Sequence, residues 1–392
     1  MADLFHRASA SFNSLERLYL GKNNLGDDSI NAIAAILAKS KSLKLDLRGL
    51  MLKMYDNPLG VNGLQALQNI VCSCRIGMLN LAGSLTNDVD VNAELLLALS
   101  SNCQSLWDLD LSRNNLGETG AIALKKILPQ LKKTSLHLNE CRLGNEGMAT
   151  LTQGLEGTCH LKSLQLRDNG INAAGIQHLV DSVCAGRIVI RKGIFNTLLL
   201  ADNPLGLEGA MTLTKMFSNK HFQARRIDLS GCNLTVGVDG LDHRKSMTCE
   251  DFRKQICSPQ NQSNTVQSLN LDNNYFNGLG IHILAGFIYI CPLLKSLDCC
   301  GCNINDGDLK QLFAQLSELN VELKDLNTWN LNDNYINNGQ VSARIENLPC
   351  FPKLKNINMN NQDQMSLRES TESELTNQYP CVRMCIACII TA

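Results

Sequence analysis

The sequence predicts an α/β solenoid in the form of a horseshoe, with a parallel β-sheet on the concave face and helices on the convex face. Three observations support this fold class. Aliphatic residues recur in one frame at spacings of two and three, an Asn or Cys follows most groups at a fixed place, and a glycine-containing turn then leads into an apolar pattern with four-residue spacing. Such units pack on their neighbours, so the 392 residues form a repeat array rather than several ordinary domains.

The first part of each unit is predicted to be a short strand. In the clearest copy, Leu109 and Leu111 lie two positions apart and point to the buried face, whereas Asp110 between them points outward. The frame recurs about twelve times along the chain. Most of these copies carry Asn or Cys at the place that follows the strand, and the weaker copies carry a substitute there. Successive places are mostly about 27 to 34 residues apart, at positions 23, 57, 84, 114, 141, 169, 203, 232, 274, 302, 334 and 362.

The second part of each unit is predicted to be a tight, buried turn. The side-chain amide of Asn114 is suited to pair with backbone groups of such a turn, which removes orphan donors and acceptors from a buried bend. Cys141, Cys232 and Cys302 occupy the same place as small apolar fillers with a weak donor. We therefore expect a ladder of Asn and Cys side chains along the array.

The third part is predicted to be a helix with one buried face. Leu116 and Gly117 begin a glycine-rich turn that ends at Gly120, and Leu124 and Leu128 follow at the four-residue spacing of a helix. The paired glycines permit a tight turn and a close approach of the helix to the strand. Each unit is therefore strand, loop and helix.

These residues carry a resemblance to a known family. The frame L-x-x-L-x-L-x-x-N/C-x-L, followed by L-G-x-x-G and an amphipathic helix, resembles the ribonuclease-inhibitor class of leucine-rich repeats over about residues 13–365. That class alternates Asn and Cys at the ladder place, and this chain does so in part, with a slip between Asn169 and Asn203. The resemblance implies a leucine-rich-repeat solenoid that binds proteins.

The repeats define the predicted domain organisation. Residues 1–365 form one leucine-rich-repeat domain with loop insertions near 41–56, 184–194 and 235–265, and residues 366–392 form a C-terminal cap or tail. Insertions in solenoids are usually loops on one rim, and some of them bind partners.

The tail is rich in cysteine, and its role has three interpretations. A structural role in a cap is favoured, because Cys381, Cys385 and Cys388 lack a nearby fourth ligand for zinc. C-terminal acylation beside the apolar Ile residues is a further hypothesis, although no basic patch supplies the second signal for a membrane anchor.

Composition excludes several classes of function. The 36 Lys and Arg residues balance 37 Asp and Glu residues, and aromatic residues make up 5%, which argues against a nucleic-acid partner. Neither a signal peptide nor a run of ~18–20 apolar residues is visible, so we expect no membrane span. The 17 cysteines are then best interpreted as reduced thiols of a cytoplasmic protein.

The outward strand residues do not form a pattern typical of catalysis. Asp110 and His137 lie on neighbouring strands with Ser135 nearby, but this trio fits a binding face better than a catalytic triad. The chain also lacks a glycine-rich phosphate loop before a Lys-Ser or Lys-Thr pair. We therefore expect a non-catalytic protein with no cofactor and no metal site.

The favoured function is a protein–protein interaction scaffold whose partner binds the concave face. Tryptophan and arginine most often dominate the binding energy of interfaces, and outward polar strand residues supply hydrogen bonds. The residues expected to bind the partner are Trp107, Asp110, Arg113, His137, Gln165, Arg167, Asp228, Asn270, Asp298 and Asn330.

Four other functions remain open. The repeats are similar to those of Ran GTPase-activating proteins, which implies a GTPase-activating or other GTPase-regulating role in which Arg113 or Arg167 reaches the nucleotide. The class also includes ribonuclease inhibitors. An innate-immune sensor fragment similar to NOD-like receptors and a microbial effector that mimics host repeats are further alternatives, because fold does not fix function.

Overall fold

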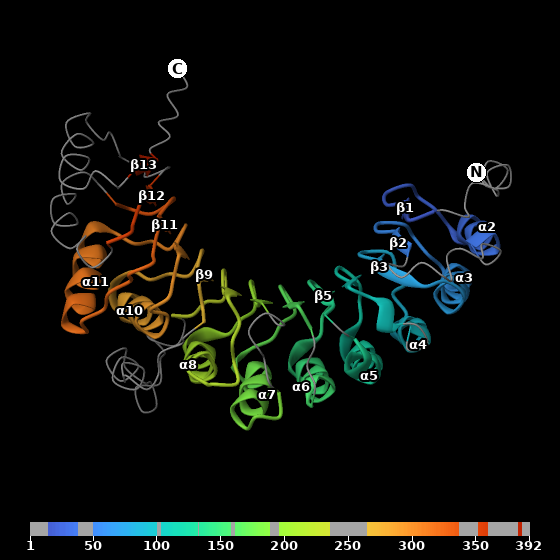
Figure 1. Ribbon diagram of the computed structural model, residues 1–392, viewed down its shortest axis with the longest axis horizontal. Helices are drawn as coiled ribbons and strands as arrows, with labels where there is room; N and C mark the ends of the chain where they lie inside the picture. The colour runs from blue at the N-terminus through green and yellow to red at the C-terminus, as the bar shows by residue number, and fades with distance from the viewer. Residues whose placement is uncertain are drawn as a thin grey trace, which may run out of the picture. The chain divides into compact units, whose positions relative to one another are not determined.

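The computed structural model describes residues 15–37, 50–99, 103–131, 133–157, 161–188, 196–235, 265–336, 352–359 and 383–385. The chain divides into two compact units, Met1–Leu198 and Leu199–Ala392, which are described separately. In each unit short parallel strands lie along one side and helices along the other (Figure 1). The predicted α/β class with a parallel sheet and helices on one side is therefore confirmed.

In its described residues, unit 1 alternates strands and helices, with two short 3-10 segments. Its elements are β1 (Arg17–Tyr19), α2 (Asp27–Leu37), β2 (Leu50–Lys53), α3 (Val61–Ser73), β3 (Ile76–Asn80), α4 (Val89–Leu99), η3 (Cys103–Ser105), β4 (Asp108–Asp110), α5 (Gly117–Ile127), η4 (Leu128–Gln130), β5 (Ser135–His137), α6 (Gly144–Leu155), β6 (Ser163–Gln165) and α7 (Ala173–Cys184). The central residues of neighbouring strands pair in register, which aligns the buried Leu18, Leu52, Leu79, Leu109, Leu136 and Leu164.

Unit 2 repeats this arrangement. The strand β7 (Thr197–Leu199) lies at the division, and the remaining elements are α8 (Gly206–Phe217), β8 (Arg226–Asp228), β9 (Ser268–Asn270), η6 (Gly278–Gly280), α10 (Ile281–Ile290), β10 (Ser296–Asp298), α11 (Asp306–Glu318), β11 (Thr328–Asn330), β12 (Asn356–Asn358) and β13 (Arg383–Cys385). Trp329 takes the place of the central leucine in β11, and its ring meets that of Phe313 edge to face at 6.1 Å.

The turn after each strand is held by the predicted ladder. Asn114 donates from Nδ2 to the carbonyl oxygens of Leu111 at 2.8 Å and of Leu81 in the preceding repeat at 3.0 Å, and its Oδ1 accepts from the Leu85 N–H at 2.9 Å. Cys141 keeps one of these bonds, from its thiol to the Leu111 carbonyl oxygen at 3.3 Å. Asn114 and Cys141 therefore tie their turns to the repeat before them.

The paired glycines act as the sequence predicted. Gly117 has a φ of 54°, in the left-handed region that favours glycine. A Cβ atom on Gly120 would lie 2.6 Å from Cβ of Leu116, so only glycine permits this approach at the start of α5. The apolar face that follows is buried, as shown by the 0% exposure of Leu124.

Several predicted segments fall partly outside the described residues. Residues 50–53 of the 41–56 segment form β2, whereas 41–49 are outside. The other insertions are outside at 189–195 and 236–264. In the tail, β13 pairs in parallel with β12, while Cys381 and Cys388 are outside the described ranges. Within those ranges, no helix has the length and apolar character needed to cross a membrane.

Candidate functional site

Each unit has a sheet face that its helices leave uncovered, and we call it the open face of that unit. It consists of the outward side chains of the strands and of the turns that follow them. In β4 and β5 a buried leucine is flanked by two partly exposed polar residues, which is the predicted alternation. The predicted binding residues from Trp107 to Arg167 lie in unit 1, and those from Asp228 to Asn330 lie in unit 2.

The register in unit 1 brings the predicted strand residues side by side. Asp110 pairs with His137 on β5, and His137 pairs with Gln165 on β6. Trp107, directly before β4, is 40% exposed, which is unusual for so large an apolar side chain. Register therefore brings a carboxylate, an imidazole and an amide side by side on the open face of unit 1, and the exposed ring of Trp107 lies directly before β4.

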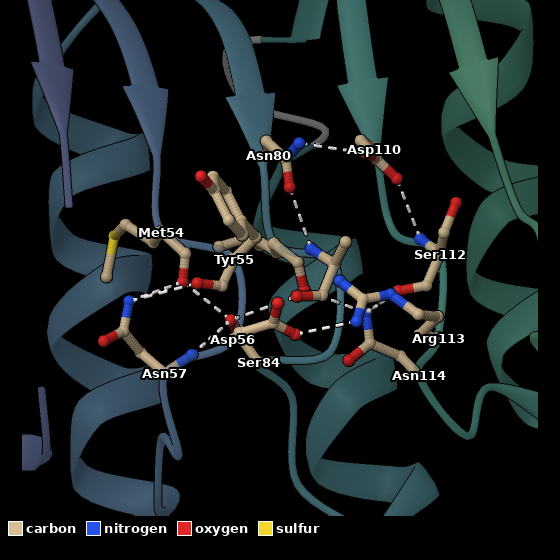
Figure 2. A network of polar contacts seen from close by, with 12 residues as sticks. Met54, Tyr55, Asp56, Asn57, Asn80, Ser84, Asp110, Ser112, Arg113 and Asn114 are labelled. Carbon is tan, nitrogen blue, oxygen red and sulfur yellow. Dashed lines mark hydrogen bonds and ion pairs between the residues drawn. The ribbon is translucent and has the colours of Figure 1, made fainter. Parts of the chain in front are cut away.

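The charged group beside His137 is Asp108. Asp110 is the register neighbour of His137, as the sequence predicted, but its carboxylate accepts hydrogen bonds from Nδ2 of Asn80 at 2.9 Å and from the Ser112 N–H at 3.0 Å (Figure 2). Asp108 lies closer to the imidazole, with 3.7 Å between its Oδ2 and Nε2 of His137. Asp108 and Asp110 lie two positions apart on β4 and therefore on the same face of the strand. The two-residue period of the strand could have indicated that Asp108 also lies near His137.

The surroundings of His137 favour its protonated form. Burial is the largest influence and lowers the pKa of His137, but Asp108, Asp110 and Gln165 together outweigh it and raise this pKa above the ordinary value of 6.5. A proton on His137 therefore gives this part of the face a positive group beside the two carboxylates of β4.

Arg113 forms an ion pair that the sequence did not reveal. Its guanidinium lies 2.9 Å from Oδ1 of Asp56, and its side chain is 46% exposed (Figure 2). The pair passes over Gly83, where a Cβ atom would lie 2.7 Å from Oδ1 of Asp56. Asp56, Gly83 and Arg113 each directly precede a ladder residue in successive repeats, and all three have a positive φ. That shared turn position could have indicated from the sequence that Arg113 and Asp56 lie in one row, on either side of Gly83.

Asn139 fixes the two predicted residues at the other side of this face. Its Nδ2 donates to Oε1 of Gln165 at 3.1 Å, and its Oδ1 accepts from the N–H of Arg167 at 3.0 Å. The side chain of Arg167 is exposed. The amide of Gln165 and the backbone of Arg167 are therefore positioned before any partner arrives.

The open face of unit 2 is dominated by carboxylates and amides. Register places Asn270 between Asp228 and Asp298, and Asp298 next to Asn330. Asp272, two residues after Asn270, belongs to the same face and was not predicted. Its Oδ1 accepts from the Cys300 N–H at 2.6 Å.

The carboxylates of unit 2 are partly shielded from water and repel one another. Burial, together with the charges of Asp298 and Asp228, raises the pKa of Asp272 to about 6, although the bond from Cys300 opposes the shift. Burial likewise raises the pKa of Asp298, with Asp228 contributing in the same direction. Among the described residues, the open face of unit 2 therefore gathers several carboxylates, and Arg226 on β8 is a basic group that acts on Asp298.

The buried thiols Cys141, Cys232 and Cys291 are poor candidates for nucleophilic chemistry. Burial raises the pKa of Cys141, Cys232 and Cys291 to about 12, so these thiols stay protonated near neutral pH. In the described part of the chain, no group of three or more His, Cys, Asp or Glu side chains is arranged to hold a metal ion.

Comparison with known proteins identifies the repeats. Residues 13–34, 102–125, 134–151 and 158–180 match the family described as Leucine Rich repeat. The chain is 26% identical to NACHT, LRR and PYD domains-containing protein 3 of Macaca mulatta over 71% of its own length and 27% of that protein. It is also 26% identical to the ribonuclease inhibitor of Mus musculus over 68% of its own length. That match spans 60% of the mouse protein.

Solved structures were compared as well. A chain of the yeast Rad7 and Elc1 complex has a TM-score of 0.48 and 15% identity, covering 100% of this chain and 91% of that one. The leucine-rich-repeat-containing protein LegL7 from Legionella pneumophila has a TM-score of 0.44 and 18% identity, covering 77% and 89%. Taken together, the matched repeats, the two kinds of relative and the Asn and Cys ladder show that the chain is a leucine-rich-repeat protein of the ribonuclease-inhibitor-like class.

Proposed function

We propose that this chain is a non-catalytic scaffold that binds a protein partner on its open faces. The observation that carries the proposal is the exposure of Arg113 and Arg167 in the turns of the open face, and of Trp107 directly before β4, beside strands that the described helices of unit 1 leave uncovered. Tryptophan and arginine are the residue types most often dominant in interfaces. The full set of proposed contacts is Trp107, Asp110, Arg113, His137, Gln165, Arg167, Asp228, Asn270, Asp298 and Asn330.

The same face is prepared for binding before a partner arrives. Asp110 is held by Asn80, Gln165 by Asn139, and Arg113 by Asp56. Side chains that are already ordered lose less conformational entropy on association, which favours affinity. Extended loops that fold on binding would not offer this advantage.

A reducing compartment, the cytoplasm, fits the ladder. The thiols of Cys141, Cys232 and Cys302 donate to carbonyl oxygens of the preceding repeats at 3.3, 3.2 and 3.2 Å. A thiol has this hydrogen only in its reduced form. We therefore propose a cytoplasmic protein whose ladder cysteines stay reduced.

The test is partner capture by matched variants of the full chain. One variant carries Trp107→Ala, His137→Ala and Arg167→Ala on the open face of unit 1. The control carries Glu118→Ala, Ile122→Ala and Lys126→Ala, which are exposed on one side of α5. Proteins captured by the unchanged chain are identified by mass spectrometry, purified, and titrated against all three chains by calorimetry.

We expect the open-face variant to lose the partner and the α5 variant to keep it, with both showing the circular dichroism of the unchanged chain. The opposite pattern, in which the α5 variant loses the partner and the open-face variant retains full affinity, would overturn the proposed function.

Inhibition of a ribonuclease is the second candidate, because ribonuclease inhibitors of mouse and pig are among the relatives. Titration of the chain into a pancreatic-type ribonuclease assay tests it, and full enzyme activity at micromolar chain would remove it. The GTPase-regulating role has less support, since Arg113, one of the two arginines that this alternative would place at the nucleotide, is paired with Asp56.

A further inference from the structure

We propose that a second surface, at the edge of unit 2 where its strands begin, binds an acidic helix of another protein. We call this edge the entry rim of unit 2. It consists of the residues that directly precede the strands β8 to β12, namely Arg225, Gln267, Lys295, Asn327 and Lys355. The entry rim is separate from the open faces, so the inference goes beyond the proposed function and does not depend on it.

The five residues of the entry rim form one row across the sheet. The first residues of β8 to β12 pair in register, so the residues directly before them are neighbours as well. Backbone bonds continue the ladder into this row. The Lys295 N–H donates to the Gln267 carbonyl oxygen at 2.7 Å, and the Lys355 N–H donates to that of Asn327 at 3.0 Å. A cation and an amide therefore alternate along the rim.

The rim residues belong to the side of the strands opposite to the open face. Lys295 lies two positions before the buried Leu297, whereas Ser296 and Asp298 are the outward residues of β10. Successive residues of a strand alternate between its two faces, so Lys295 does not join the carboxylates of the open face. Arg225, Lys295 and Lys355 are nevertheless exposed, because they lie at the edge of the sheet.

The three cations of the rim have no acidic partner. Within the part of the chain that the structure describes, no ion pair joins any of them to a carboxylate. The acidic residues in the described segments that lead into β8 to β12 are Glu322 and Asp325, which already pair with Lys324 at 3.3 Å and with Lys353 at 2.6 Å. Positive charge at this edge therefore exceeds the negative charge of these segments.

Asp325 is an internal example of a carboxylate held at this edge. Its Oδ1 accepts a hydrogen bond from Nζ of Lys353 at 2.6 Å. The bond and the charge of Lys353 are the main causes that lower the pKa of Asp325 below its ordinary value, and Lys295 of the rim adds to them. The carboxylate of a ligand that approaches the rim cations is stabilised in the same way.

The spacing of the cations matches an α-helix better than an extended chain. Neighbouring strands lie about 4.8 Å apart, so successive rim cations, which are two strands apart, are separated by about 10 Å at their Cα atoms. Seven residues of an α-helix rise about 10.5 Å and return to nearly the same side of the helix. Residues on one face of an extended chain repeat every ~7 Å, which places none of them at the spacing of the cations. A helix with an acidic residue at every seventh position therefore meets all three cations.

An exposed leucine beside the central cation favours an amphipathic helix as the ligand. Leu293 is 37% exposed and lies two residues before Lys295. An apolar side chain of the bound helix removes this surface from water, whereas a wholly polar polyanion such as a nucleic acid strand leaves it exposed. We therefore choose an acidic protein helix over a nucleic acid.

The corresponding row of unit 1 provides an internal contrast. Gly77, Trp107, Thr134 and Lys162 are neighbours through the same kind of backbone bonds and register. This row contains a single cation, so it offers no repeat for acidic side chains. The inference therefore applies to unit 2.

The probes are two fluorescein-labelled, helix-forming peptides of about 18 residues. The aligned peptide carries glutamate at three positions that are seven residues apart, with a leucine beside the central one. The spread peptide has the same composition, but its glutamates lie on different sides of the helix. Fluorescence anisotropy at fixed, low ionic strength measures the binding of each peptide to the full chain and to its variants.

Two variants of the full chain lose the same charge at different places. The rim variant carries Arg225→Gln, Lys295→Gln and Lys355→Gln. The control variant changes three exposed lysines on helices α5, α8 and α11, with Lys126→Gln, Lys215→Gln and Lys310→Gln. Circular dichroism checks that both variants keep the fold. A third variant, Lys295→Glu, is titrated with an aligned peptide whose central glutamate is replaced by lysine.

We expect the rim variant to bind the aligned peptide about tenfold more weakly, while the control variant stays near the unchanged chain. The unchanged chain should bind the spread peptide several-fold more weakly than the aligned one. Lys295→Glu should lose affinity for the aligned peptide and regain it for the peptide with the central lysine, because the exchange restores the pairing of opposite charges.

Equal weakening in the rim and control variants would mean non-specific charge attraction and would overturn the inference. Equal affinity for the aligned and spread peptides, or no recovery in the charge exchange, would overturn it as well. Tighter binding of a single-stranded oligonucleotide of equal charge would show that the rim recognises phosphates instead. These measurements leave the open faces unchanged, so their outcome is independent of partner capture.

Discussion

Nε2 of His137 lies 3.7 Å from Oδ2 of Asp108 on the neighbouring strand. Burial lowers the pKa of His137, but Asp108, Asp110 and Gln165 raise it by more than burial lowers it. The folded chain therefore binds this proton more tightly than the unfolded chain does. Protonation of His137 therefore contributes fully to the stability of the fold below the unfolded pKa of 6.5. This contribution is lost as the pH rises through the folded pKa of His137. This relationship makes the open face of unit 1 sensitive to pH.

Replacement of Asp108 should lower the pKa of His137. In Asp108→Asn the nearest carboxylate is gone while burial remains, so the imidazole should titrate at a lower pH than in the unchanged chain. Asp110→Asn should produce a smaller change, because Asp110 is held by Asn80 and Ser112. NMR titration of the His137 ring measures both shifts. An unchanged or raised pKa in Asp108→Asn contradicts the assignment of Asp108 as its partner.

Removal of a ladder side chain should destabilise unit 1. Asn114→Ala deletes the bonds to the Leu81 and Leu111 carbonyl oxygens and from the Leu85 N–H, all in a buried turn. We expect a loss of about 3 kcal/mol in the free energy of unfolding, since buried unpaired groups cost about 1–3 kcal/mol each. Urea unfolding followed by circular dichroism measures it.

Asn114→Cys is the informative companion variant. A thiol at this place donates to a carbonyl oxygen, as Cys141 does in the next repeat, but it leaves the Leu85 N–H without its acceptor. Its stability should therefore fall between those of the unchanged chain and Asn114→Ala. If Asn114→Ala unfolds at the same urea concentration as the unchanged chain, the ladder does not stabilise the turn.

Two glycine substitutions should have opposite effects on stability. Gly120→Ala places a Cβ atom 2.6 Å from that of Leu116, and relief of the clash should cost about 1–3 kcal/mol despite the better helix propensity of alanine. Gly26→Ala meets no heavy atom within 4 Å and should stabilise the chain by about 0.4–1 kcal/mol. Thermal unfolding of the two variants gives the comparison. A stabilised Gly120→Ala would show that α5 can shift at no cost.

The fold was predictable because local spacing encodes it. Two-residue spacing placed Leu109 and Leu111 on the buried face, and the position of Asn114 after them identified the turn. The same logic placed Asp110 and His137 as register neighbours. These features depend on backbone geometry that repeats in every unit, so a single chain reveals them.

Side-chain pairing was less predictable, because it depends on torsions and on neighbours several strands away. The position of Asp108 could have been predicted, since it lies on the same face of β4 as Asp110. The ion pair between Arg113 and Asp56 could not have been predicted, because it spans a repeat and requires the open space over Gly83. The pKa of Asp272 was equally hidden, since burial and the charges of two other strands set it.

Arg113 has an unfavourable backbone conformation, and its replacement tests whether partner binding rather than stability of the fold explains its presence. Its φ of 58° lies in the left-handed region, which costs a non-glycine residue about 1–2 kcal/mol, while its exposed ion pair with Asp56 returns at most about 1 kcal/mol. Arg113→Gly should therefore be as stable as the unchanged chain or slightly more stable. It should nevertheless bind the partner about tenfold more weakly, because it removes an arginine from the interface.

Glu140→Gly is the matched control for this prediction. Glu140 occupies the same turn position in the next repeat, with a φ of 56°, and is not among the proposed contacts. It should gain stability in the same way while keeping its affinity for the partner. Thermal unfolding and calorimetric titration of both variants separate the two effects. If Arg113→Gly is strongly destabilised and binds normally, Arg113 serves the fold through Asp56, and its place in the binding face has to be withdrawn.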